Sequence, residues 1–65
     1  MSTIETGWVI ELGTSDPSDP SYWVGGVAWS KYSLQAVRFC RKEDAEAVCR
    51  HLPGINNRIC EHQWG

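Results

Sequence analysis

The chain has 65 residues, which is enough for one domain at most, and the core of a domain this small contributes only about 3–5 kcal/mol of net stability. Six lysines and arginines stand against eight aspartates and glutamates, so the formal net charge is −2, and no run of basic residues occurs. This balance argues against a nucleic-acid backbone as the main partner, because that role needs a basic stripe.

The cysteine count and the absence of targeting segments bear on the compartment. Three cysteines, at positions 40, 49 and 60, form no closed disulfide framework, which favours free thiols in a reducing cytosol. The first residues lack the basic start and apolar stretch of a signal peptide, and no run of about 18 apolar residues is present. We therefore expect a soluble protein of the cytoplasm.

The first regular element is predicted at residues 7–12, where polar and apolar positions alternate as in a half-buried strand. Its helix-facing side is formed by Trp8, Ile10 and Leu12. Val9 and Glu11 then point to the opposite face. Residues 13–20 combine nearly all turn-forming residue types with two prolines, so we expect an exposed loop with no apolar anchor.

Residues 22–29 are nearly symmetric about Gly25-Gly26. The pattern favours a β-hairpin whose turn uses the positive φ angles that glycine permits, with Tyr22 opposite Trp29. The alternative is one long strand with a glycine bulge, where a ligand or a second backbone could approach closely. Residues 34–39 are then predicted to form a further short strand, with Val37 and Phe39 on one face.

A helix is the clearest prediction, over residues 41–52. Its apolar positions follow the spacing i, i+3, i+4 and i+7 at Ala45, Val48, Cys49 and Leu52. Acidic residues occupy the first turns and basic residues the last, which opposes the helix dipole, and Pro53-Gly54 ends the element. Neither residue available for the N-cap, Cys40 or Arg41, can accept the unpaired amide hydrogen bonds.

Residues 58–64 are predicted to form the last strand. The elements together predict an α+β fold: a small four-stranded, mostly antiparallel sheet with one α-helix on one face, in the order β-β-β-α-β, within a single domain over residues 1–65.

Six short motifs are spread over most of the chain: Trp8-Val9-Ile10-Glu11, Tyr22-Trp23, Trp29-Ser30, Ala36-Val37-Arg38-Phe39, Glu43-Asp44-Ala45-Glu46 and Glu61-His62-Gln63-Trp64-Gly65. Together they resemble the motifs of a loose group of small uncharacterised phage and prophage proteins. Many proteins of that group have Ser or Thr before the helix, where this chain has Cys40-Arg41. The resemblance implies a phage origin and a role in the host cytoplasm, for instance in blocking a CRISPR or other host-defence complex. It transfers no activity to individual residues.

Zinc binding and nucleophilic catalysis by the cysteines have less support from the sequence than a purely structural role. Cys49 with His51, and Cys60 with His62, could be drawn as zinc ligands, but residues two apart on a helix diverge and no C-x-x-C pair exists. Cys40 or Cys60 with His62 could be drawn as a nucleophile and its base, but nothing supplies an orienting group or oxyanion site. Glu11 and Glu61 are expected on solvated faces. We predict no enzyme activity, no cofactor and no metal.

The aromatic residues are the main candidates for binding. One helix hides only one face of a sheet, so we expect part of the aromatic set to lie exposed, and exposed Trp and Tyr anchor protein interfaces. The candidate binding residues are Tyr22, Trp23, Trp29, Arg38 and Trp64. The leading hypothesis is a non-enzymatic protein that binds a host protein target, with a homodimer through the open sheet face as a second use of that surface. The alternative is a small-ligand binder, such as a sponge for a nucleotide signal, with Arg38 or Arg58 as phosphate partner.

Overall fold

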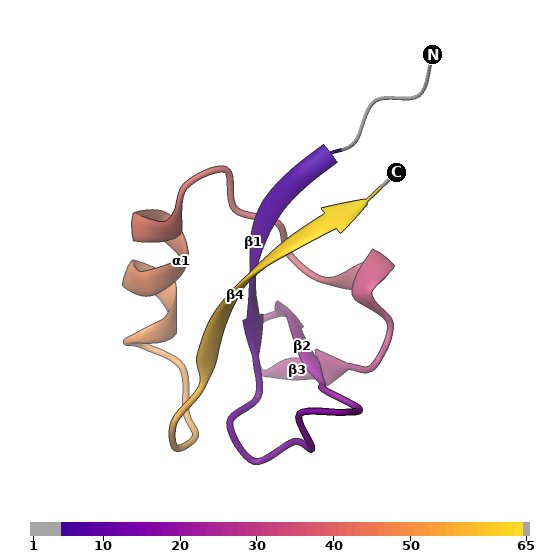
Figure 1. The fold of residues 1–65 in the computed structure, drawn as a ribbon. Coiled ribbons are helices and arrows are strands. Elements are labelled where there is room, and N and C mark those ends of the chain that lie inside the picture. Colours follow the sequence, from indigo (N-terminus) through magenta and orange to yellow (C-terminus); the bar gives the residue numbers. More distant parts are fainter. Residues whose placement is uncertain (1–4, 65) are drawn as a thin grey trace.

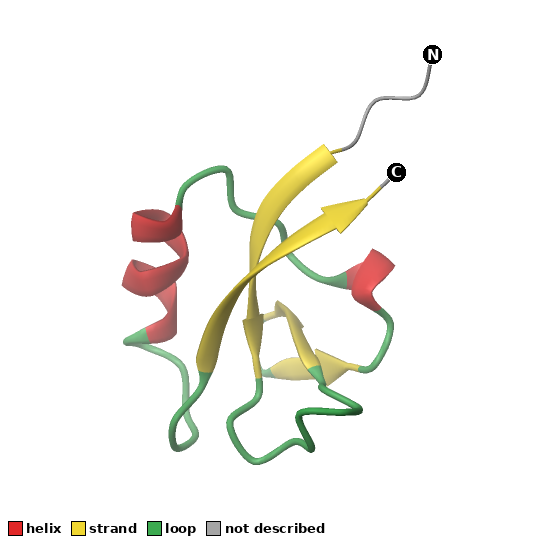
Figure 2. Ribbon diagram, viewed as in Figure 1, coloured by secondary structure: helices red, strands yellow, loops and turns green. Residues whose placement is uncertain are grey.

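The computed structural model describes residues 5–64, which form one four-stranded antiparallel sheet with an α-helix packed on it (Figures 1 and 2). The elements in chain order are β1 (Glu5–Glu11), β2 (Tyr22–Gly25), β3 (Ala28–Ser30), the 3₁₀ turn η1 (Ser33–Gln35), α1 (Lys42–Cys49) and β4 (Arg58–Trp64). The strand order across the sheet is β3-β2-β1-β4. The α+β class and the β-β-β-α-β order are as predicted.

The long pairing of β1 with β4 is the centre of the fold. The two strands pair antiparallel over seven residues, from Glu5 opposite Trp64 to Glu11 opposite Arg58. Val9 and Ile10 are neighbours on β1, so their side chains point to opposite faces, and both are fully buried. The sheet is therefore covered on both faces at this point, and the expectation that Val9 lies on an open face is wrong.

The helix covers the face that carries Trp8 and Ile10, as predicted. Ala45 is fully buried, and the Lys42 ammonium lies 5.7 Å from the centre of the Trp8 ring. The helix is shorter than the predicted 41–52, because the N–H groups of His51 and Leu52 donate to the carbonyls three residues earlier. Its last turn is thus tightened into a 3₁₀-type turn before Pro53.

The segment before the helix covers the other face and is not the strand predicted at residues 34–39. It begins with η1 and then runs extended, and Figure 1 shows η1 and α1 on opposite sides of the β1–β4 ribbon. Ala36 packs with Val9 and Tyr22 in a second core. Phe39 exchanges two backbone hydrogen bonds with Trp8, whereas the Val37 N–H donates to Trp23. The hydrogen bonds of this segment are divided between β1 and β2, and only one isolated bridge, between Trp8 and Phe39, is formed.

The hairpin is confirmed, but its register differs from the prediction. Trp23 lies opposite Trp29, and Tyr22 lies opposite Ser30. The reason is an irregularity between Trp23 and Gly25 that shifts the pairing, so the tight turn falls at residues 26–27. The single long strand is excluded, because residues 22–25 and 28–30 pair with each other.

The loop over residues 13–20 is largely exposed, as predicted, and its start is held by hydrogen bonds rather than by apolar contacts. The Gly13 N–H donates to the Asn57 side-chain oxygen at 2.9 Å, and the Asn57 amide donates to the Pro53 carbonyl. A Cβ on Gly13 would lie 2.0 Å from the Ile55 carbonyl oxygen. The start of the loop is therefore pressed against the turn that precedes β4.

The helix begins without a side-chain cap, as predicted. Arg41 occupies the N-cap position with φ −128° and ψ 141°, and its side chain accepts no amide hydrogen bond. We expect Arg41→Ser to raise the free energy of unfolding by about 1 kcal/mol, because a serine hydroxyl can accept from the first-turn amides. Urea denaturation measures the change. Arg41→Ala is the control, since it removes the same guanidinium without adding an acceptor, and an equal gain in both variants would contradict the capping explanation.

Candidate binding surface

The most unusual surface of the fold is the outer edge of β4. This strand is the last in the sheet order, and no described segment pairs with its second edge. Trp8 on β1 lies opposite Glu61 on β4. Its backbone N–H and carbonyl both form hydrogen bonds with Phe39, so these groups point away from β4. By the alternation of antiparallel ladders, Glu61 and its neighbours two positions away, Ile59 and Gln63, turn their own backbone groups outward. The edge therefore presents a regular series of backbone donors and acceptors.

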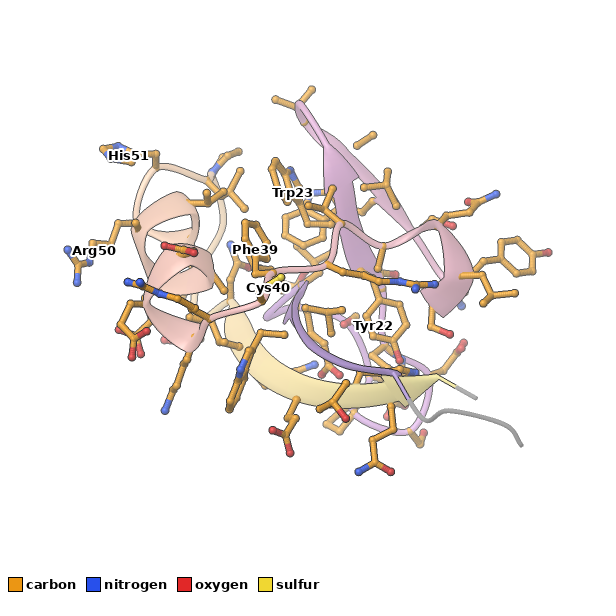
Figure 3. All side chains as sticks on the ribbon, turned by 90° about the horizontal axis from the view of Figure 1, so that it is seen from above. Tyr22, Trp23, Phe39, Cys40, Arg50 and His51 are labelled. Atoms are coloured by element: carbon orange, nitrogen blue, oxygen red, sulfur yellow. The ribbon has the colours of Figure 1, made fainter. Side chains whose placement is uncertain are left out.

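A groove runs beside this edge, between β4 and α1. It has a volume of about 310 Å³, is open to solvent and is lined by Glu46, Cys49, Arg50 and Ile59. Three of these residues are spaced i, i+3 and i+4 on the helix, so they form one stripe. Ile59 and Cys49 are half-buried, whereas the Arg50 side chain extends outward from α1 (Figure 3). The groove thus combines apolar walls with charged groups on its rim.

The predicted binding residues are not brought together into one site. Tyr22 is buried in the second core. The Trp23 ring stacks on Phe39 with a centroid separation of 6.1 Å, and its indole N–H donates to the Gly26 carbonyl (Figure 3). Trp29 is half-buried, and Arg38 is exposed. The Trp64 side chain lies outside the described residues. Trp23 therefore packs against the segment before the helix, and Arg38 is the only described candidate that is exposed.

The most exposed large apolar side chains are ones that sequence reasoning missed. They are Val27, Tyr32, Leu34 and Ile55, each more than two-thirds exposed. Val27 is in the hairpin turn, and Tyr32 and Leu34 flank the start of η1. Their position beside turns was the available signal, because a side chain at a turn has few neighbours to cover it.

A cluster of polar side chains lies on the face opposite α1. The Arg58 guanidinium donates from Nε to Glu11 Oε1 at 3.1 Å, and the Glu11 side chain is only 15% exposed. Cys60 is next along β4 on the same face, and the His62 ring meets the Tyr22 ring edge-on at 6.0 Å. Glu11 is therefore not on a solvated face as expected, whereas Glu61 is exposed.

The protonation of this cluster disfavours nucleophilic chemistry. Burial raises the pKa of the Cys60 thiol, and the Glu11 carboxylate raises it further, against a smaller opposing effect of Arg58. Burial also raises the pKa of the Cys49 thiol and, together with Glu11, that of the Tyr22 phenol. A raised thiol pKa lowers the thiolate fraction at neutral pH, and the thiolate is the reactive form.

These shifts predict an alkaline loss of stability. The Cys49 and Cys60 thiols and the Tyr22 phenol hold their protons more tightly in the folded state than in the unfolded state. Their contribution to the free energy of unfolding is therefore fully present below the ordinary thiol pKa of 9.0 and is lost as the pH rises through the folded pKa values. We expect the urea midpoint to fall between about pH 7.5 and pH 10.5. Cys60→Ala should show a shallower fall, and a midpoint that rises with pH would contradict the prediction.

Among residues 5–64, no group of three or more His, Cys, Asp or Glu side chains is placed to hold a metal ion. Within the same residues, no helix is long and apolar enough to cross a lipid bilayer. No family model, curated protein or solved structure that was compared with the chain matches it. The resemblance to small phage proteins therefore rests on the sequence motifs alone.

Proposed function

We propose that this chain is a non-enzymatic interaction protein that binds an extended segment of another polypeptide as a fifth strand on the free edge of β4. The observation that carries this proposal is the unpaired seven-residue edge beside the groove of α1. Strand addition takes its affinity from backbone hydrogen bonds and its specificity from pockets for alternate side chains. The outward backbone groups of β4 could supply the hydrogen bonds, and the groove beside Ile59 could accept one side chain.

Binding of a small ligand, the alternative function, has less support. A nucleotide sponge would need an accessible aromatic face for stacking and an available guanidinium for phosphate. Trp23 already stacks on Phe39, and Arg58 is engaged by Glu11. Arg38 is exposed, but it is not without an interaction partner.

The sequence resemblance to small phage proteins is the basis for proposing a class of bound protein. On that basis we propose a host protein as the target, in the cytoplasm of a phage-infected cell, with a CRISPR or other defence complex as the leading class. Binding to an exposed segment of the target would inhibit the target without a catalytic step. The raised pKa values of the Cys49 and Cys60 thiols agree with this, because they disfavour nucleophilic catalysis.

A display library of random heptapeptides tests the proposal without knowledge of the host. We expect peptides to be enriched on the wild-type protein and to shift the amide resonances of Ile59, Glu61 and Gln63. Glu61→Pro removes an outward N–H that the ladder with β1 does not use, so the fold should survive while peptide affinity falls more than about tenfold.

Glu61→Ala is the matched control, because it removes the side chain and keeps the backbone donor. Its affinity should stay within about fivefold of wild type, the size of one cross-strand side-chain contact. An empty selection, or peptides that bind Glu61→Pro as well as wild type, would refute strand addition at this edge.

A further inference from the structure

We infer that the segment bound at β4 runs antiparallel to it and carries a basic residue two positions before an apolar one, so that the base faces Glu61 and the apolar side chain enters the groove beside Ile59. This inference rests on the proposed strand addition and specifies its partner. It follows from which side chains share a face along the edge and from the charges around the groove.

All three residues with outward backbone groups also point their side chains to the helix face. Ile59 lies opposite Ile10, Glu61 opposite Trp8 and Gln63 opposite Thr6, and directly opposed residues share a face. Residues of an added strand that lie opposite these three would point to the same face, next to α1. The added strand therefore presents every second side chain to the groove and the remaining ones to the other face.

The groove beside Ile59 and the Glu61 carboxylate favour different side chains in the bound segment. Next to Ile59, the half-buried Cys49 and the stems of the helix residues form an apolar wall, which suits an aliphatic side chain. Glu61 is exposed, and no ion pair of a described side chain engages it. Glu46 on the rim is matched by the Arg50 guanidinium. The Lys42 ammonium on this face lies 5.7 Å from the centre of the Trp8 ring without an ion pair to Glu61. A lysine or arginine opposite Glu61 would complete this surface.

A second copy of β4 fits this edge poorly. In a two-fold pairing centred on Glu61, two carboxylates would lie directly opposite each other, which is destabilising. In a pairing centred on Cys60, Ile59 would lie opposite Glu61 of the other copy, so the apolar position would face a charge. A pairing centred on Ile59 would place the two isoleucines opposite each other but Glu61 opposite Asn57. Because none of these registers supplies a base to Glu61, the charges favour a different chain as the occupant.

Synthetic peptides test the partner chemistry. The probe is a seven-residue alternating peptide with lysine and leucine at the positions that face Glu61 and Ile59, and threonine at the positions that face away. We expect lysine-to-glutamate in the peptide to weaken binding about tenfold, and leucine-to-serine to weaken it by a similar factor. The charge-reversed variant Glu61→Lys should restore binding of the glutamate peptide and reject the lysine peptide.

The outcomes separate this inference from the proposed function. If selected peptides bind at the β4 amides but show no basic residue two positions before an apolar one, or if Glu61→Lys leaves the charge preference unchanged, the partner chemistry is wrong and strand addition stands. If no peptide binds at those amides, strand addition itself fails. A solution mass of twice 7.3 kDa that falls to one copy in Glu61→Pro would assign the edge to a second copy and overturn the inference.

Discussion

Gly13→Ala is expected to leave most of the protein unfolded. An added Cβ would lie 2.0 Å from the Ile55 carbonyl oxygen and 2.4 Å from the Asn56 carbonyl carbon, and both atoms belong to the backbone. The turn would have to move as a unit, and the hydrogen bond from the Gly13 N–H to Asn57 would be lost with it. We expect a cost of about 3 kcal/mol or more, close to the whole stability of so small a domain.

Thermal melting followed by circular dichroism measures this effect, with an expected drop in Tm of at least about 12 °C. Gly26→Ala is the matched control. Gly26 has a positive φ of 57° but nothing within 4 Å of an added Cβ, so its substitution costs only the backbone strain, about 1 kcal/mol. A loss for Gly13→Ala no larger than that for Gly26→Ala would show that the loop does not press on the turn before β4.

Arg58→Met is expected to cause the second largest loss of stability. The methionine keeps much of the side-chain volume but leaves the Glu11 carboxylate, which is 15% exposed, without its cation. Removing one partner of a fully buried pair costs about 3–5 kcal/mol, and the partial exposure of this pair lowers the expectation to about 2 kcal/mol. Urea denaturation of the variant at neutral pH gives the value.

A double variant separates the ion pair from simple packing. Glu11→Leu combined with Arg58→Met removes both charges, so it should be clearly more stable than Arg58→Met alone. Arg41→Met is the control for an exposed pair, because Arg41 contacts Glu43 and Asp44 at 3.6 and 3.9 Å in solvent and should contribute almost nothing. If the double variant is as unstable as the single one, the loss comes from the arginine's packing.

The elements with strong periodic patterns were predictable from the sequence. The alternation at residues 7–12 and the helical spacing from Ala45 to Cys49 each report a single element, and β4 was placed at residues 58–64 as observed. The helix entrance at Arg41 was also predictable, because cap chemistry depends on one residue type.

Features that depend on distant segments were not predictable. Val9 was assigned to an open face, because alternation cannot show that residues 33–39 fold back over it. Glu11 was assigned to solvent, since its partner Arg58 is 47 residues away. The predicted hairpin register was wrong because glycine-rich strands specify their register only weakly.

The candidate binding surface could not be predicted from the sequence either, because it also depends on distant segments. The free edge of β4 exists because of the strand order, and the groove exists because Ile59 lies beside a helical stripe of Glu46, Cys49 and Arg50. The aromatic residues were predicted as binding anchors, but Tyr22 and Trp23 pack within the fold itself. The aromatic side chains of this short chain therefore contribute mainly to its two small cores.

The pairing of β1 with β4 also sets how the chain must fold. Strand β1 forms its longest pairing with β4, which lies about fifty residues later in the chain. Its pairing with β2, which comes between them in the sequence, has only one register pair. Contacts of such high sequence separation slow folding, so we expect milliseconds to seconds rather than microseconds. During synthesis, the edge of β1 that pairs with β4 stays unpaired until Arg58 and the residues after it have left the ribosome. For that interval the nascent chain carries an apolar strand with an open edge, the kind of segment that chaperones bind and that aggregates when they do not.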